Sequence, residues 1–227
     1  MLELINKTAL ILFLAAVPFL FYGFGAETLR VISKFSFGDS RALAFLAGAA
    51  IFLPCLALAR RFFHSAWCYL ETLEHELTHL LIGLLFLKIP VGIRVSAHAG
   101  GEVRQIGRGT TGQIWITLAP YFFPTVSIAV LIVAHFADLN VLVVLGVLGW
   151  TTAFHLISNW GETSFRQPDL QKAGILKTIL ILPVMNLICY GAIFAFVAGG
   201  SKNFGNFWLA GATGSFQAFV RLCQCIF

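Results

Sequence analysis

Long apolar runs recur along almost the whole chain, and this feature limits the possible fold more than any other. A helix that spans a bilayer needs about 20 mostly apolar residues. Of the 227 residues, 59% are hydrophobic and only 11% are charged, whereas a soluble domain carries about 25% charged residues. The sequence therefore predicts an all-α polytopic membrane protein with about six transmembrane helices.

The six predicted spans differ in how clearly they are bounded. The first has a small-x-small ending that is typical of a signal peptide, but the run is long for one, and we expect a retained helix. Pro120 and Pro124 predict a kink or a break in the fourth. The glycine-interrupted tail from Phe204 predicts a re-entrant or surface-lying segment rather than a seventh span. The predicted spans cover about residues 8–26, 42–59, 66–87, 113–136, 141–156 and 175–197.

A small β-hairpin is predicted after the third span. Apolar and polar residues alternate over residues 91–107 on both sides of Gly100-Gly101, which is the pattern of two strands joined by a turn. Strand edges in hydrocarbon would leave backbone groups unpaired, so the hairpin must lie at the membrane interface or against protein. We divide the chain into residues 1–65 with two helices, a core over 66–200 and an apolar tail over 201–227.

The distribution of basic residues predicts an orientation. Ten of the fifteen lysines and arginines fall in the loops after the first, third and fifth spans, and the richer side should be cytoplasmic. Both the hairpin and the loop over residues 159–169 would then face the cytoplasm. No basic cluster exceeds Arg60-Arg61, so no nucleic-acid partner is expected. The five cysteines show no C-x-x-C spacing, which indicates neither a disulfide framework nor a cysteine zinc site.

The third run contains the pattern H-E-x-x-H, within Glu74-His75-Glu76-Leu77-Thr78-His79. Histidines four apart lie on one face of a helix, so His75 and His79 can bind the same Zn²⁺. Glu76 lies about 100° around the helix from His75, where it can act as general base on a water that the metal activates. Because ionisable residues inside a membrane are usually functional, we predict a zinc site; the alternative is a metal-free buried polar network.

A third ligand must come from elsewhere, since a catalytic zinc has three protein ligands and an open position. Asp169 ranks first, because it precedes the sixth span on the side to which the end of the third span points. Glu162 in the same loop ranks second, and His155 at the end of the fifth span ranks third. An Asp after Pro168 also suits a helix N-cap, which is the other interpretation of Asp169.

Over roughly residues 66–192 the chain resembles the site-2-protease family of intramembrane zinc metalloproteases. The resemblance rests on residues 74–79 within a span, on the Gly-Gly hairpin, and on Asn159 followed by Pro168-Asp169. The last motif reads Pro-Asp-Leu here, whereas the family usually has Leu-Asp-Gly. It implies zinc binding by His75, His79 and Asp169, with Glu76 as the base and Asn159 as an oxyanion donor. It also implies that the hairpin edge pairs with an extended substrate.

We therefore expect a zinc-dependent endopeptidase, a hydrolase that cuts a transmembrane protein substrate from within the lipid bilayer. It would be a multi-pass protein of a bacterial cytoplasmic membrane, with its active site towards the cytoplasm. The alternative is a non-proteolytic transporter or assembly factor that binds a metal or protons. A histidine-box oxidase is excluded, because such a site needs further histidine pairs and the remaining histidines are isolated in sequence (His64, His98, His135 and His155).

Overall fold

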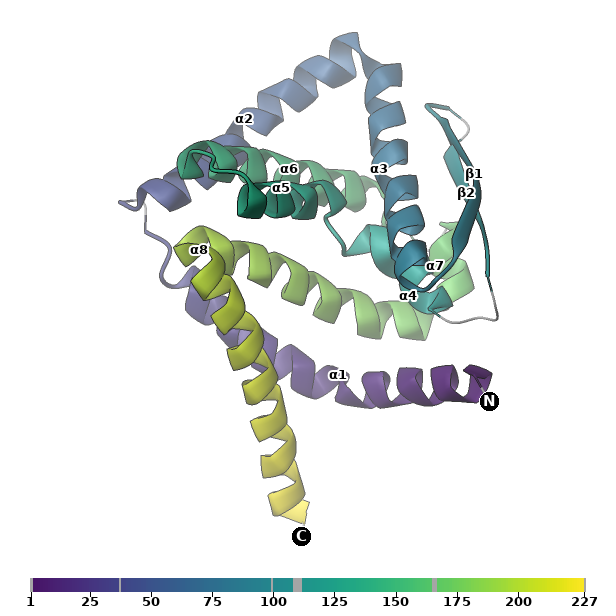
Figure 1. The fold of residues 1–227 in the computed structure, drawn as a ribbon, viewed down its shortest axis with the longest axis vertical. Helices are drawn as coiled ribbons and strands as arrows, with labels where there is room; N and C mark the ends of the chain where they lie inside the picture. Colours follow the sequence, from purple (N-terminus) through teal and green to yellow (C-terminus); the bar gives the residue numbers. More distant parts are fainter. Residues whose placement is uncertain (1, 37, 99, 108–111, 165–166, 227) are drawn as a thin grey trace. The chain divides into compact units, whose positions relative to one another are not determined.

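The computed structural model describes residues 2–36, 38–98, 100–107, 112–164 and 167–226. In these ranges the chain is mostly helical and contains one antiparallel pair of strands (Figure 1). The elements are α1 (Leu2–Ile32), α2 (Ser40–Phe62), α3 (His64–Leu85), β1 (Ile89–Ser96), β2 (Gly100–Ile106), α4 (Gln113–Leu118), the 3₁₀ helix η1 (Ala119–Tyr121), α5 (Thr125–Phe136), α6 (Val141–Glu162), α7 (Pro168–Ala173) and α8 (Ile175–Ile226).

Four described helices are long and apolar enough to cross a membrane, namely α1, α2, α6 and α8. The broken pair of α4 with η1 and α5 makes a fifth if it counts as one span. The expected number of six is not confirmed. The motif helix α3 is long enough, but every stretch of 18 residues in it contains Glu71, Glu74 and Glu76, whereas each of the four apolar helices has such a stretch with at most two charged residues. Several long apolar helices are nevertheless what a membrane protein requires.

Two predictions about local structure are confirmed. The hairpin spans Ile89–Ile106, with Ile93 opposite Val103 and Ser96 opposite Gly100. The fourth predicted span is broken, because α4 and η1 meet α5 at an angle of 89°. The prolines explain the break: Pro120 lacks the N–H that a continuing helix needs, and Pro124 lies directly before α5.

The chain forms two compact units, of which residues 44–175 together with the amino-terminal six residues make the first. Within this unit α3 packs against both strands, and the hairpin runs alongside it (Figure 1). An aromatic cluster of Phe52, Trp67 and Phe154 joins α2, α3 and α6. Close helix crossing needs small residues here: a Cβ on Gly48 or Gly149 would meet the backbone of the facing helix.

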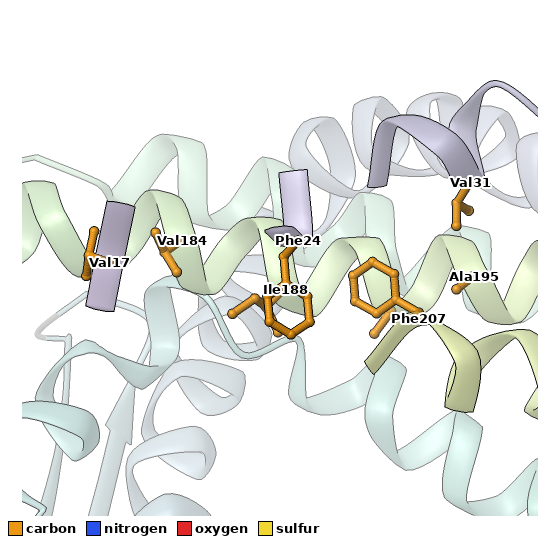
Figure 2. Close-up of a cluster of buried hydrophobic side chains, with 8 residues drawn as sticks. Val17, Phe24, Val31, Val184, Ile188, Ala195 and Phe207 are labelled. Atoms are coloured by element: carbon orange, nitrogen blue, oxygen red, sulfur yellow. The ribbon is translucent and has the colours of Figure 1, made fainter. Parts of the chain in front are cut away.

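The second unit comprises residues 7–43 and 176–227. Its core is formed by α1 and both halves of α8, and Figure 2 shows Val17 and Phe24 of α1 facing Val184 and Ile188 of α8. The helix α8 is interrupted at Gly199 and Gly200, where φ at Gly200 is +66°. The glycines beyond residue 204 do not break the tail, which is helical as far as Ile226.

Candidate metal centre

Three side chains converge at the carboxyl-terminal half of α3. His75 and His79 lie one helical turn apart, with ring centroids separated by 4.9 Å. The Asp169 carboxylate comes from α7, ninety residues further along the chain; its Oδ2 lies 3.1 Å from Nε2 of His79 and 3.6 Å from Nε2 of His75. The structure thus brings together the three residues that the sequence ranked first as ligands.

The spacing of these atoms suits a zinc ion. Zinc takes nitrogen and oxygen ligands at about 2.0–2.2 Å in tetrahedral geometry, which separates the ligand atoms by about 3.4 Å. One ligand atom from each of His75, His79 and Asp169 lies within 4.8 Å of the other two. Two imidazoles and one carboxylate are also a common donor set for catalytic zinc. The residues present therefore fit the ion that the sequence predicts.

A backbone carbonyl fixes the ring of His79. Its Nδ1 lies 2.8 Å from the carbonyl oxygen of Ile116 in α4, so Nδ1–H donates there and Nε2 is left to bind the metal. In a continuous helix the N–H of residue 120 would compete for this carbonyl, but residue 120 is proline. The break in the predicted fourth span therefore supplies the acceptor that orients a metal ligand.

The hairpin holds the proposed base, Glu76, in place. Its side chain is buried and accepts a hydrogen bond from the backbone of Val103 in β2. Gly101 lies directly over it, because a Cβ at that position would collide with the Glu76 side chain. The strand therefore has to carry glycine where it crosses the motif. The glycine pair, expected in the turn, lies instead in the first two residues of β2, with Gly100 paired to Ser96 and Gly101 to Val95.

A second contact fastens β2 to the motif helix. Nε2 of Gln105 donates to the carbonyl oxygens of His79 and Leu80, at 3.3 Å and 3.1 Å. Gly83 makes room for this side chain, since a Cβ there would overlap the Gln105 amide. Because α3 carries two of the predicted ligands, this contact couples the position of the hairpin to the geometry of the metal centre.

The carboxylate of Asp169 is held in its charged form. Burial alone would raise the pKa of this carboxyl, but the neighbouring imidazoles of His75 and His79 and the ammonium of Lys172 outweigh burial and hold the pKa well below its usual range. The ammonium of Lys172 also lies 3.4 Å from Oδ1. Asp169 belongs to the first turn of α7, where an N-cap was the other interpretation, but the cap position is Gln167 and its side chain makes no cap hydrogen bond.

Neither of the other two ranked ligands, His155 and Glu162, is found in this cluster within the described part of the structure. His155 is 1% exposed, and its Nδ1 lies 3.0 Å from Oε1 of Glu74. Asn159, the expected oxyanion donor, places its Nδ2 2.9 Å from Nε2 of the same histidine. Glu74, His155 and Asn159 thus form a separate polar network between α3 and α6. The side chain of Glu162 lies outside the described part of the structure.

An open cavity of about 360 Å³ adjoins the metal centre. Its wall includes Glu76, His79 and Asp169 on one side and the hairpin residues from Gly101 to Gly107 on another. Lys88 and Lys172 line it as well. The cavity is polar, contacts the predicted base, two predicted ligands and a strand, and provides room for water beside them.

Sequence reasoning missed several residues that support the site. The Ile116 carbonyl, Gln105 and Gly83 act through contacts between segments far apart in sequence. Pro120, four residues after Ile116, is a local signal that this carbonyl lacks its helical partner. Thr78, inside the motif, is fully buried and contacts the Thr125 hydroxyl at the start of α5, and no local pattern indicates this contact.

Comparison of the chain with family models, with curated proteins and with solved structures finds no match. Geometry and chemistry therefore carry the functional argument.

Proposed function

We propose that this protein is a zinc metalloprotease that hydrolyses a peptide bond of membrane-spanning proteins. The observation that carries the proposal is the convergence of His75, His79 and Asp169 beside Glu76, at a polar cavity edged by a β-strand. A buried polar network alone would not require an open cavity at the same place. It would also not require two imidazoles and a carboxylate at the spacing of zinc ligands.

Each side chain has a defined part in the proposed reaction. His75, His79 and Asp169 would hold the ion, and the Ile116 carbonyl would keep His79 in the tautomer that presents Nε2. When bound, zinc would supply a Lewis acid that makes water a stronger nucleophile at neutral pH. Glu76 would accept the proton of the attacking water and pass it to the leaving amine.

The substrate would lie extended along the cavity side of β2. Strand addition satisfies the backbone groups of both partners, and this matters in a membrane, where unpaired backbone groups are costly. The part of β2 that lines the cavity, between Gly101 and Gln105, begins directly against Glu76. A transmembrane substrate would have to unwind locally before it could pair in this way.

We further propose that α3, together with the broken pair α4 and α5, lies at membrane depth, in a multi-pass protein of a bacterial cytoplasmic membrane with its active site towards the cytoplasm. The excess of basic residues in the loops after the first, third and fifth predicted spans supports this orientation. The polar cavity would give water access to the site.

Glu76→Gln separates the protease from a non-catalytic metal protein. The substitution removes the proton acceptor and keeps the shape of the side chain, so we expect cleavage of a reconstituted transmembrane substrate to fall at least a hundredfold, with zinc content unchanged. The measurements are gel-based cleavage and metal analysis of the purified protein. Undiminished cleavage by the variant would refute the proposal. A wild-type protein that binds zinc but cuts no substrate would favour a non-proteolytic role.

A further inference from the structure

Two polar side chains of the cavity wall have no part in the proposed chemistry. Gln113 and Thr117 lie one turn apart on α4, and both line the cavity, as Glu76 and Asp169 do. Nε2 of Gln113 donates a hydrogen bond to Oγ1 of Thr117, at 3.3 Å. Thr117 is buried, whereas Gln113 is exposed. The threonine therefore positions an amide group that remains accessible.

Two contacts fix α4, and with it this pair, relative to the predicted metal ligands. The Ile116 carbonyl, which lies between the two residues in sequence, accepts the hydrogen bond from His79. At the start of the helix, a Cβ on Gly112 would overlap the ring of Phe86, the residue that caps α3. Gly112 also has φ at +71°, a conformation that favours glycine. The Gln113 amide is thus placed by contacts of its neighbours with α3.

The cavity lies between β2 and α4. Both elements pack against α3, and the cavity wall includes residues between Gly101 and Gln105 of β2 and between Gln113 and Thr117 of α4. In a β-strand, alternate residues direct their N–H and C=O groups to one side, and the residues between them direct theirs to the other side. A substrate strand that pairs with β2 would therefore direct its second row of backbone groups towards α4.

That second row of backbone groups needs hydrogen-bond partners. An unpaired backbone group is costly in a membrane or in a protein interior, so a strand that pairs along one edge only is incompletely bound. A glutamine side chain matches a peptide group, because it carries both N–H donors and a carbonyl acceptor. The bond to Thr117 uses one N–H of Gln113, and the amide also carries a second N–H and a carbonyl.

We infer that Gln113, positioned by Thr117, hydrogen-bonds the outer backbone edge of the substrate strand, so that the cavity recognises an extended peptide from both sides. The inference rests on the proposed proteolytic function and names the substrate feature that the same cavity reads, which is a backbone N–H on the side away from β2. Recognition of this kind does not depend on the side chains of the substrate. It holds the strand beside Glu76 whatever its sequence.

The test measures whether one backbone N–H of a peptide is coupled to Gln113. The parent probe is a fluorescein-labelled peptide of about ten residues, rich in Val, Thr and Ala and without internal repeats, which is long enough to pair along the whole of β2. In a series of variants of this probe, an ester oxygen replaces one backbone N–H at a time. Fluorescence anisotropy gives the Kd of each probe for full-length, zinc-loaded Glu76→Gln protein. We expect ester replacement to raise Kd about twofold to tenfold at each paired position, as for the loss of one hydrogen bond.

Adding Gln113→Ala to this protein should abolish the effect of the ester at one position that faces away from β2. The Kd of the parent peptide should rise about twofold to tenfold, and the ester at that position should raise it no further. The ester effects at the positions that face β2 should persist. Thr117→Val should act like Gln113→Ala, whereas Thr117→Ser keeps the hydroxyl and should leave Kd unchanged. Gln217→Ala, at an exposed helical glutamine outside the cavity, is the matched control.

The outcomes separate this inference from the proposed function. Alternating ester effects of which none is coupled to Gln113 would keep strand pairing with β2 and overturn the inference. Equal weakening of all probes by Gln113→Ala, or a parent peptide that does not bind, would overturn it as well. Coupling to Gln113 in a protein that cuts no substrate would support the inference and favour a non-proteolytic role. In a protein that cuts, Gln113→Ala should raise KM and leave kcat unchanged, because the contact is the same in the ground state and the transition state.

Discussion

The contact between His155 and Glu74 gives the sharpest test of which histidines bind metal. Both side chains are buried, at 1% and 6% exposure, and they lie 3.0 Å apart. His155→Ala leaves the Glu74 carboxylate without this partner inside the protein. Leaving a buried acceptor without its donor costs about 1–3 kcal/mol. For a chain of this length that corresponds to a decrease in Tm of roughly 2–12 °C.

The assay combines thermal unfolding in detergent with metal analysis of the same sample. We expect His155→Ala to lower Tm by this amount and to keep its zinc. Glu74→Gln should cost less, about 1 kcal/mol, because the amide still accepts a hydrogen bond from His155. Replacing both residues by leucine should be milder than His155→Ala alone, since no buried carboxylate remains.

Two results would contradict the reasoning. Loss of zinc from His155→Ala with an unchanged Tm would make His155 a metal ligand and would remove Asp169 from first place. If Glu74 and His155 act as a pair, the double variant should lose less stability than the two single variants lose together. A double variant that loses as much as that sum, or more, would show that the two side chains do not act as a pair. Asp169→Ala serves as the reference in the same measurement, because it should lose zinc.

Three further predictions concern other parts of the molecule. Gly101→Ala places a methyl group against Glu76, so cleavage should fall at least tenfold in a kinetic assay while zinc content is retained; unchanged kcat would contradict the contact. Removal of zinc by a chelator should lower Tm, and added zinc at about one hundred times its Kd should restore about 2.7 kcal/mol of stability; a Tm that ignores zinc would argue against a metal centre. Gly200→Ala should destabilise the protein by about 1–3 kcal/mol in an unfolding titration, because φ is +66° and ψ is −156° there; Gly205→Ala, at a helical glycine with open space around it, is the control.

Local sequence patterns predicted the parts of this structure that depend on near neighbours. Three patterns each predict a local backbone conformation. They are the four-residue spacing of His75 and His79, the alternation on both sides of Gly100-Gly101, and the prolines in the fourth apolar run. The first choice of Asp169 required one step more, because it used the direction of a helix through the membrane. The structure places that carboxylate beside both histidines.

Contacts between distant segments were not predictable in the same way. His155 was ranked third as a ligand because it ends the fifth predicted span, but its partner Glu74 lies 81 residues away and nothing local in the sequence links the two. Asn159 was assigned to the site by resemblance, and its amide contacts His155 instead. The expected six spans counted α3 by its apolar length, but its three glutamates lie near its middle, whereas each of the four candidate spans has an 18-residue stretch with at most two charged residues.

The proline at position 120 has a consequence for how the site would acquire the proposed zinc. Because the Ile116 carbonyl already accepts a hydrogen bond from His79, the imidazole is turned towards the ion position before any ion arrives. Preorganisation of this kind removes the entropy of ordering a ligand from the binding step. At the proposed zinc site, a helix interruption, which in a bilayer would ordinarily be a weak point of the fold, would thus contribute to metal affinity. Pro120→Ala would return an N–H to compete for the carbonyl, and zinc would then have to bind a histidine that is free to rotate.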